Sequence, residues 1–242
     1  AIECKGLRKE YPGKLAVKGL ELAVAEGEFF SLLGVNGAGK TTTIRMLTCL
    51  TRPSAGDATL MGHSVVTDAA GVREVTGLSP QETAVAGNLT VRENLLLMVE
   101  LYGTPRAVAL KKTEEMLELT GLAEVADRRA KVLSGGWQRR LSVAMALISE
   151  PKVLFLDEPT LGLDILARRE LWKLIHSLRG KITLVLTTHY LEEAEALSDR
   201  IGIMKNGELI AVGTVAELNA RAGTESFEET FVRLCTGEEA DR

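Results

Sequence analysis

One short segment limits what this chain can fold into more than any other feature of its sequence. Residues 34–41 read GVNGAGKT and match the P-loop pattern G-x-x-x-x-G-K-[ST] at all four defined positions. The segment directly follows an apolar run at residues 29–33, and a helical pattern begins near Lys40. A glycine-rich loop between a strand and a helix presents backbone N–H groups and the positive end of the helix to phosphate. The sequence therefore predicts a phosphate-binding loop rather than a plain glycine-rich turn.

The residue types of this P-loop predict separate tasks. Glycine leaves room for a phosphate chain to approach the backbone, and Lys40 supplies a point charge to the β and γ phosphates. The hydroxyl of Thr41 is of the type that ligates Mg²⁺. The candidate nucleotide-binding residues of this segment are Gly34, Val35, Asn36, Gly37, Ala38, Gly39, Lys40, Thr41 and Thr42.

The pattern along the chain indicates an α/β fold. Short runs of valine, isoleucine and leucine alternate with amphipathic helical patterns, which is typical of βαβ units around a parallel sheet. Residues 29–33, 153–156 and 182–186 are predicted to be central strands, because they are apolar on both faces. Each ends at polar residues. Since ligands of open α/β sheets bind at the carboxyl ends of the strands, these polar residues are expected to converge.

The middle of the chain follows a helical pattern. Thr90 and Glu93 form a predicted capping box, and residues 111–119 form a second amphipathic stretch. No convincing strand occurs between Thr90 and Arg140. We therefore expect a helical subdomain inserted in the sheet.

Two further local patterns occur near the end of the chain. Asn206 and Gly207 lie between two apolar runs, which predicts a β-hairpin. Thr214 and Glu217 are spaced as a capping box for a following helix.

A second chemical motif follows the strand predicted at residues 153–156. Asp157 and Glu158 lie at the carboxyl end of that strand. Asp157 is expected to hold Mg²⁺ through water, and Glu158 to orient or deprotonate the attacking water. Most Asp-Glu pairs are solvated turn residues, but the apolar strand and the upstream P-loop favour the chemical interpretation.

A third motif, LSGGWQ at residues 133–138, begins 24 positions before Asp157. Taken alone, a serine with two glycines before a helix is most often a cap, although it is also an anion site. With the P-loop and the Asp-Glu strand, the stretch resembles the signature of the ATP-binding subunit of ABC transporters. The resemblance covers about residues 2–222.

The resemblance implies a fold and a division of the chain. The fold is a P-loop NTPase with a RecA-like core of mostly parallel strands, an N-terminal antiparallel β-subdomain and the inserted helical subdomain. Residues 1–222 form the ATPase domain, with the helical subdomain at about 82–140. Residues 223–242 form a C-terminal tail.

The resemblance also implies roles for residues outside the P-loop. Ser134, Gly135 and Gly136 cap the γ-phosphate of ATP bound to a partner subunit; Trp137 departs from the family's consensus glutamine. Tyr11 stacks on adenine, and Gln81 touches Mg²⁺ and senses the transmembrane partner. Asp164 lies in the loop that crosses the dimer interface. His189 is the switch histidine that holds the water and Glu158 in position, whereas His63 and His176 lack such a context.

The implied assembly is an ATP- and Mg²⁺-dependent ATPase that powers a transporter, with a second ABC ATPase subunit and a transmembrane permease as partners. Short similarities at residues 36–47, 89–95 and 188–194 favour a bacterial exporter. The expected location is cytoplasmic, on the inner face of the membrane through the permease. A net charge of −4 disfavours nucleic acid as a partner, and three widely spaced cysteines fit a reducing compartment.

The motifs leave two alternative functions open. A soluble ABC-type ATPase acting outside transport would share every motif, and co-purification with a membrane subunit would separate the two. A P-loop kinase or GTPase would need an acceptor site or an Asn-Lys-x-Asp motif, which the sequence does not contain.

Substitution of Lys40 by alanine tests the P-loop prediction. Because the variant loses a charge-assisted contact to the phosphates, we expect ATP affinity measured by calorimetry to fall about tenfold or more. Unchanged affinity would contradict a phosphate-binding role for this loop.

Overall fold

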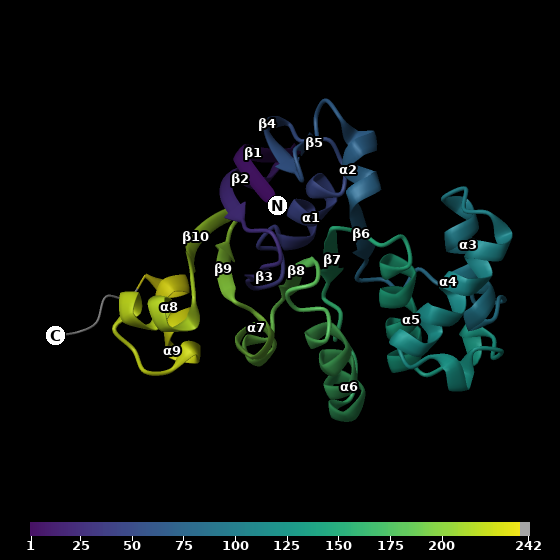
Figure 1. Cartoon of the computed structure of the whole chain (residues 1–242). Helices are drawn as coiled ribbons and strands as arrows, with labels where there is room; N and C mark the ends of the chain where they lie inside the picture. The colour runs from purple at the N-terminus through teal and green to yellow at the C-terminus, as the bar shows by residue number, and fades with distance from the viewer. Residues whose placement is uncertain (238–242) are drawn as a thin grey trace.

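The computed structural model describes residues 1–237, in which two β-sheets face each other across helix α1 (Lys40–Leu47) (Figure 1). The larger sheet has six strands in the order β10-β9-β3-β8-β7-β6. All neighbouring pairs except β9 and β10 are parallel, which confirms the predicted α/β fold. The strands are β3 (Phe29–Leu33), β6 (Thr76–Ser79), β7 (Val153–Asp157), β8 (Thr183–Thr188), β9 (Arg200–Lys205) and β10 (Glu208–Gly213).

The smaller sheet is antiparallel and is built from the first third of the chain. Its order is β2-β1-β4-β5, and α2 (Ala69–Val75) follows it in the sequence. This sheet is the antiparallel β-subdomain that the resemblance predicts. Its strands are β1 (Ile2–Tyr11), β2 (Lys14–Val24), β4 (Ala55–Leu60) and β5 (His63–Ser64).

Strand β7 shows why the central strands are apolar on both faces. Val153 and Phe155 pack into the core between the two sheets, whereas Leu154 and Leu156 pack against the helices on the opposite face. All four side chains are fully buried. Because successive side chains of a strand point to opposite faces, a sheet covered on both sides needs a continuous apolar run.

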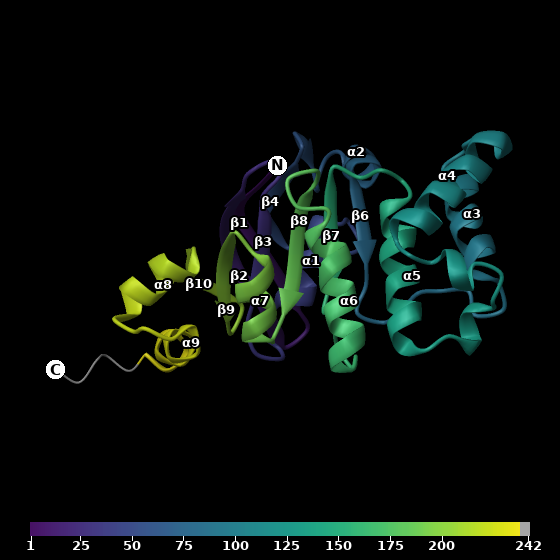
Figure 2. The same ribbon diagram turned by 60° about the horizontal axis from the view of Figure 1, so that its bottom comes forward.

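The remaining helices lie around and beyond the larger sheet. Figures 1 and 2 show α3, α4 and α5 at one end of the molecule and α8 and α9 at the other. Capping boxes at Thr90 and Thr214 begin α3 and α8, as predicted. The helices are α3 (Val91–Leu101), α4 (Arg106–Leu119), α5 (Gly135–Leu147), α6 (Ile165–His176), α7 (Leu191–Leu197), α8 (Val215–Ala222) and α9 (Phe227–Thr236), with short 3-10 turns η1 (Ala123–Val125) and η2 (Ala130–Val132).

One strand boundary differs from the prediction in a way that matters for the site. The apolar pattern ends at Leu186, but β8 continues through Thr187 and Thr188 because both residues pair with β3. The strand therefore delivers two threonines to the carboxyl edge of the sheet. The hairpin predicted at Asn206 and Gly207 joins β9 to β10. Within residues 1–237, none of the helices combines the length and apolar character that a bilayer crossing requires.

Candidate active site

The carboxyl ends of three neighbouring strands meet at one edge of the larger sheet. Leu33 of β3 lies opposite Thr188 of β8, and Asp157 of β7 lies opposite Thr187. Because these strands are parallel and in register, the loops that follow them begin side by side. The P-loop, the segment after Asp157 and the segment after β8 therefore share one region.

Packing against the neighbouring strand adds a second reason for glycine in the P-loop. A Cβ atom on Gly34 would lie 2.3 Å from the carbonyl oxygen of Met204 in β9, closer than real Cβ atoms come. From the sequence, the only reason for these glycines was that they let phosphate approach the backbone. At Gly34, the approach of β9 is enough to require glycine.

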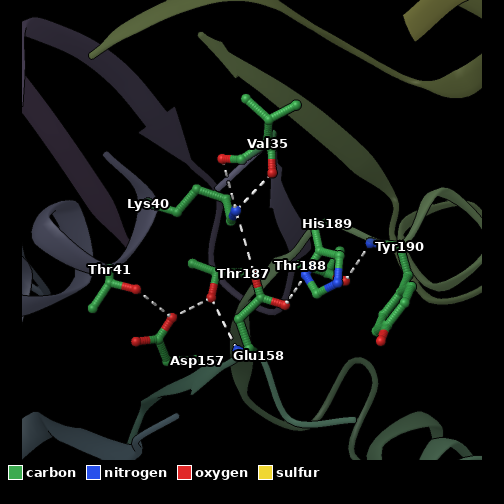
Figure 3. A network of polar contacts seen from close by, with 10 residues as sticks. Val35, Lys40, Thr41, Asp157, Glu158, Thr187, Thr188, His189 and Tyr190 are labelled. Carbon is green, nitrogen blue, oxygen red and sulfur yellow. Dashed lines mark hydrogen bonds and ion pairs between the residues drawn. The ribbon is translucent and has the colours of Figure 1, made fainter. Parts of the chain in front are cut away.

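Lys40, the first residue of α1, is almost fully buried and directed at the loop's own backbone (Figure 3). Its ammonium donates to the carbonyl oxygens of Gly34 at 2.6 Å and Val35 at 3.4 Å. The same nitrogen lies 3.2 Å from Oε1 of Glu158. The lysine thus joins the P-loop to the end of β7.

Asp157 is joined to the P-loop helix by a hydroxyl group. Its Oδ1 accepts hydrogen bonds from Thr41 at 3.2 Å and from Thr187 at 2.5 Å. Burial raises the pKa of this carboxyl, and the two hydroxyl donors oppose that shift. The carboxylate and the Thr41 hydroxyl are the hard oxygen ligands that Mg²⁺ prefers, so the residues present fit that ion.

Glu158 is buried and has an unusual backbone conformation. Its φ is 49°, in the left-handed region that glutamate rarely adopts, and its backbone N–H donates to the carbonyl oxygen of Thr187 at 3.1 Å. Such strained residues cluster at functional sites. Its Oε2 lies 2.7 Å from Nδ1 of His189, while Oε1 faces Lys40 (Figure 3). The carboxylate therefore lies between the lysine and the histidine.

Lys40, Thr41, Glu158 and His189 line a cavity of about 370 Å³. Gln81 reaches it from the loop after β6, and His189 from the loop after β8. The cavity therefore collects ten of the residues that the sequence predicted, together with three that it did not. The lining residues are Lys14, Ala16, Asn36, Gly37, Ala38, Gly39, Lys40, Thr41, Thr42, Gln81, Glu158, Leu161 and His189.

Other predicted residues lie outside this lining. Tyr11 is the last residue of β1, 37% exposed, with the Lys9 ammonium 5.0 Å from its ring centre. Gly34, Val35 and Asp157 are not part of the lining, but they contact Lys40 or Thr41.

The signature residues also lie outside the cavity. Ser134 is the N-cap residue of α5, followed by Gly135 and Gly136, but among the described residues its side chain makes no capping hydrogen bond. Asp164 does act as a cap, because its Oδ1 accepts from the N–H groups of Leu166 and Ala167, both at 2.9 Å. The exposed serine is thus available to a ligand outside its own chain.

The residues that sequence reasoning missed come to the site through tertiary structure. Lys14 and Ala16 belong to β2 of the other sheet, and no local pattern indicates that they line the cavity. Thr187 could have been found, because it directly follows the apolar part of a predicted strand at the ligand-binding edge.

Comparison with known proteins identifies the family. The model of the ABC transporter family matches residues 17–161. The chain belongs to the ABC transporter family. It is 43% identical over 225 residues to the daunorubicin/doxorubicin resistance ATP-binding protein DrrA of Streptomyces peucetius, covering 93% of this chain and 68% of the relative. It is 38% identical to the linearmycin resistance ATP-binding protein LnrL of Bacillus subtilis, covering 93% and 73%.

Solved ATP-binding cassettes share the fold. A structure described as the ATP-binding subunit of an ABC transporter matches with a TM-score of 0.85 and 28% identity, over 96% of this chain and 98% of that chain. The dimeric cassette MJ0796, in a post-hydrolysis state bound to ADP and Pi, matches with a TM-score of 0.80 and 27% identity, over 88% and 98%. The chain is therefore an ATP-binding, ATP-hydrolysing ABC subunit.

The ABC subunit carries one further buried carboxyl near its site. Glu193 of α7 is fully buried, and its Oε1 accepts from Nε1 of Trp172 at 3.0 Å. Burial raises the pKa of Glu193, and the hydrogen bond from Trp172 opposes the shift. The negative charge of Glu158 raises it further.

This raised pKa predicts how stability depends on pH. The native state holds the Glu193 proton more tightly than the unfolded chain does. The resulting contribution of Glu193 to the free energy of unfolding is fully present below the ordinary pKa of about 4.5. It is lost as the pH rises through the pKa of Glu193 in the native state. A glutamine in its place cannot ionise. From about pH 5 to about pH 8, Glu193→Gln should gain stability relative to the wild type, measured by urea unfolding. Glu195→Gln, at an exposed position on the same helix, is the control. If the stability difference between Glu193→Gln and the wild type did not change with pH, this explanation would be contradicted.

Proposed function

We propose that this chain is the ATPase subunit of an ABC exporter and that two such subunits pair head to tail around two ATP molecules. Each ATP would be held by the P-loop of one subunit and the signature of the other. Binding closes the pair, and hydrolysis opens it. In this proposal, residues 1–222 act as the ATPase domain, with residues at about 82–140 as its helical subdomain. Residues 223–242 act as a C-terminal tail, of which 238–242 lie outside the described residues.

The observation that carries the proposal is the separation of the two halves of the site. The cavity is lined by the P-loop, Gln81, Glu158 and His189, whereas Ser134 lies outside that lining with a side chain that makes no cap within residues 1–237. A serine at the positive end of a helix is a favourable anion site. If a second subunit docks its signature over the cavity, the P-loop of one chain and the signature of the other would together enclose the ATP.

Residues that line the cavity and residues close to it divide nucleotide binding between them. The P-loop amides and Lys40 neutralise the triphosphate, and Tyr11 stacks on the adenine. Thr41, Asp157 through water, and Gln81 would hold Mg²⁺. That ion neutralises charge on the β and γ phosphates when it is bound.

Glu158 and His189 act on the attacking water. Glu158 orients the water or takes its proton, and His189, 2.7 Å from that carboxylate, keeps it in place. The carboxylate is pre-positioned by the strained backbone and by Lys40. Because phosphoryl transfer depends mainly on positioning and charge neutralisation, fixed groups of this kind provide most of what the reaction needs.

The partner subunit is expected to contact Asp164 and its loop. Leu161, Ile165 and Leu166 around that loop are exposed, which fits a surface that another subunit covers. The partner is an identical chain or a homologous ATPase.

A groove next to the loop that carries Gln81 is the candidate docking site for the permease. It has a volume of about 720 Å³ and is lined by β6, α2, α3 and α5, with the apolar side chains of Leu50, Leu78, Met98, Tyr102 and Met145. A short amphipathic helix of a membrane subunit would fit such a groove. This contact would hold the chain on the cytoplasmic face of the membrane, and the drug-resistance names of its relatives favour export.

Mixing two inactive variants tests the shared site. Lys40→Ala disables the P-loop of a chain, and Ser134→Arg disables its signature. In a mixed pair, one site combines the intact P-loop of one chain with the intact signature of the other. Since equal mixing makes half of the pairs mixed, each with one intact site, we expect about a quarter of wild-type ATP hydrolysis.

The matched control mixes Lys40→Ala with Glu158→Gln. Both changes affect the same half of the site, so no pairing restores an intact one, and activity should stay absent. If the mixture of Lys40→Ala and Ser134→Arg does not hydrolyse ATP, the site is not shared between two copies of the chain.

A further inference from the structure

Arg139 is a buried cation that the mechanism above does not use. It lies on α5, five residues after Ser134, and is only 4% exposed. Its guanidinium donates to the backbone carbonyl oxygens of Pro80 at 2.6 Å and Gln81 at 2.5 Å. Burial lowers its pKa, an effect that the negative charge of Asp157 opposes. Burying a guanidinium is costly, so its position calls for an explanation.

The two carbonyls begin the loop of residues 80–90, which connects β6 to α3 and is called the Q loop below. Residues 80–87 of this loop have no regular helix or strand structure, yet Gln81 reaches the cavity. Backbone hydrogen bonds to neighbouring strands therefore do not fix the loop where Gln81 leaves the sheet. The Arg139 fork supplies two charge-assisted hydrogen bonds at that point.

Two contacts further along α5 extend this connection. The Oγ atoms of Ser142 and Ser79 lie 2.9 Å apart. A Cβ atom on Gly77 would lie 2.3 Å from the carbonyl oxygen of Ala146, so the helix backbone packs directly on β6. Residues 139, 142 and 146 share one face of the helix. The helix that begins at the signature is thus fixed along β6 up to the Q loop.

We infer that Arg139 is a positioning residue that fixes the Q-loop backbone to the signature helix and so keeps the Gln81 side chain at the cavity. The inference rests on the proposed function, which gives Gln81 its contact with Mg²⁺. Arginine suits this task because its planar fork reaches two successive carbonyls, whereas the lysine ammonium is a single point charge.

The test compares wild type, Arg139→Gln, Gln81→Ala and the double variant, with the exposed Arg128→Gln as the charge-matched control. For each full-length protein, we would measure ATP affinity without Mg²⁺, the rate at saturating ATP, and the Mg²⁺ concentration that gives half the maximal rate. We expect Arg139→Gln to lower the rate or weaken the Mg²⁺ response about tenfold, with ATP affinity unchanged. Arg128→Gln should match the wild type.

The double variant shows whether Arg139 acts through Gln81. If it does, adding Arg139→Gln to Gln81→Ala should change the rate and the Mg²⁺ response by less than about twofold. If the effects of the two substitutions on the rate and the Mg²⁺ response multiply in the double variant, the inference is overturned. It is also overturned if Arg139→Gln lowers the stability of the protein but leaves the rate and the Mg²⁺ response unchanged. If Arg139→Gln does not fold, Arg139→Lys keeps the charge and one donor, and should show a smaller effect of the same kind.

The same experiment separates failure of the inference from failure of the proposed function. Gln81→Ala with a normal Mg²⁺ response would contradict the proposed role of Gln81 and, with it, this inference. An impaired Gln81→Ala beside a normal Arg139→Gln would overturn the inference alone.

Discussion

The parallel pairing of β3, β8 and β7 is the constraint on which the site depends. These strands are buried on both faces, so their register is fixed by packing on two sides. That register brings Gly34, Asp157 and the threonines of β8 to one edge. A slip of one residue would turn each strand's side chains to the wrong face and separate Thr41 from Asp157. The chemistry of this ATPase is therefore set by the same contacts that build its core.

Buried charge is the second feature that unites the structure. Lys40, Asp157, Glu158, Arg139 and Glu193 are all nearly inaccessible to water. Each has specific partners: carbonyl oxygens for Lys40 and Arg139, two hydroxyls for Asp157, Lys40 and His189 for Glu158, and the indole of Trp172 for Glu193. Such groups add little to stability compared with apolar side chains, because the cost of removing them from water offsets the attraction. Their value is that they are already in place when phosphate arrives, so little reorganisation is needed during the reaction.

Local patterns in the sequence predicted the parts of the structure that depend on local physics. The P-loop, the strand before Asp157, the capping boxes at Thr90 and Thr214, and the turn at Asn206 each follow from a few adjacent residues. The rule that ligands bind at strand ends predicted that the polar residues after the central strands would converge, and the family resemblance singled out His189 among them. The places of Lys14 and Ala16 at the cavity, and of Arg139 against the loop that carries Gln81, could not be predicted, because each residue belongs to an element that is close only in the folded chain. The end of β8 was predicted two residues early, since its last two residues are polar yet still pair with β3.

The central claim is that ATP joins two copies of this chain across the site. The most direct measurement is the mass of Glu158→Gln in solution, by sizing chromatography with light scattering, with and without ATP and Mg²⁺. Because the variant keeps the binding residues but loses the carboxylate that acts on water, ATP should hold the pair closed. We predict a doubling of mass only when ATP is present. Mass that stays at one chain while ATP binding is intact would contradict pairing of the chain with itself.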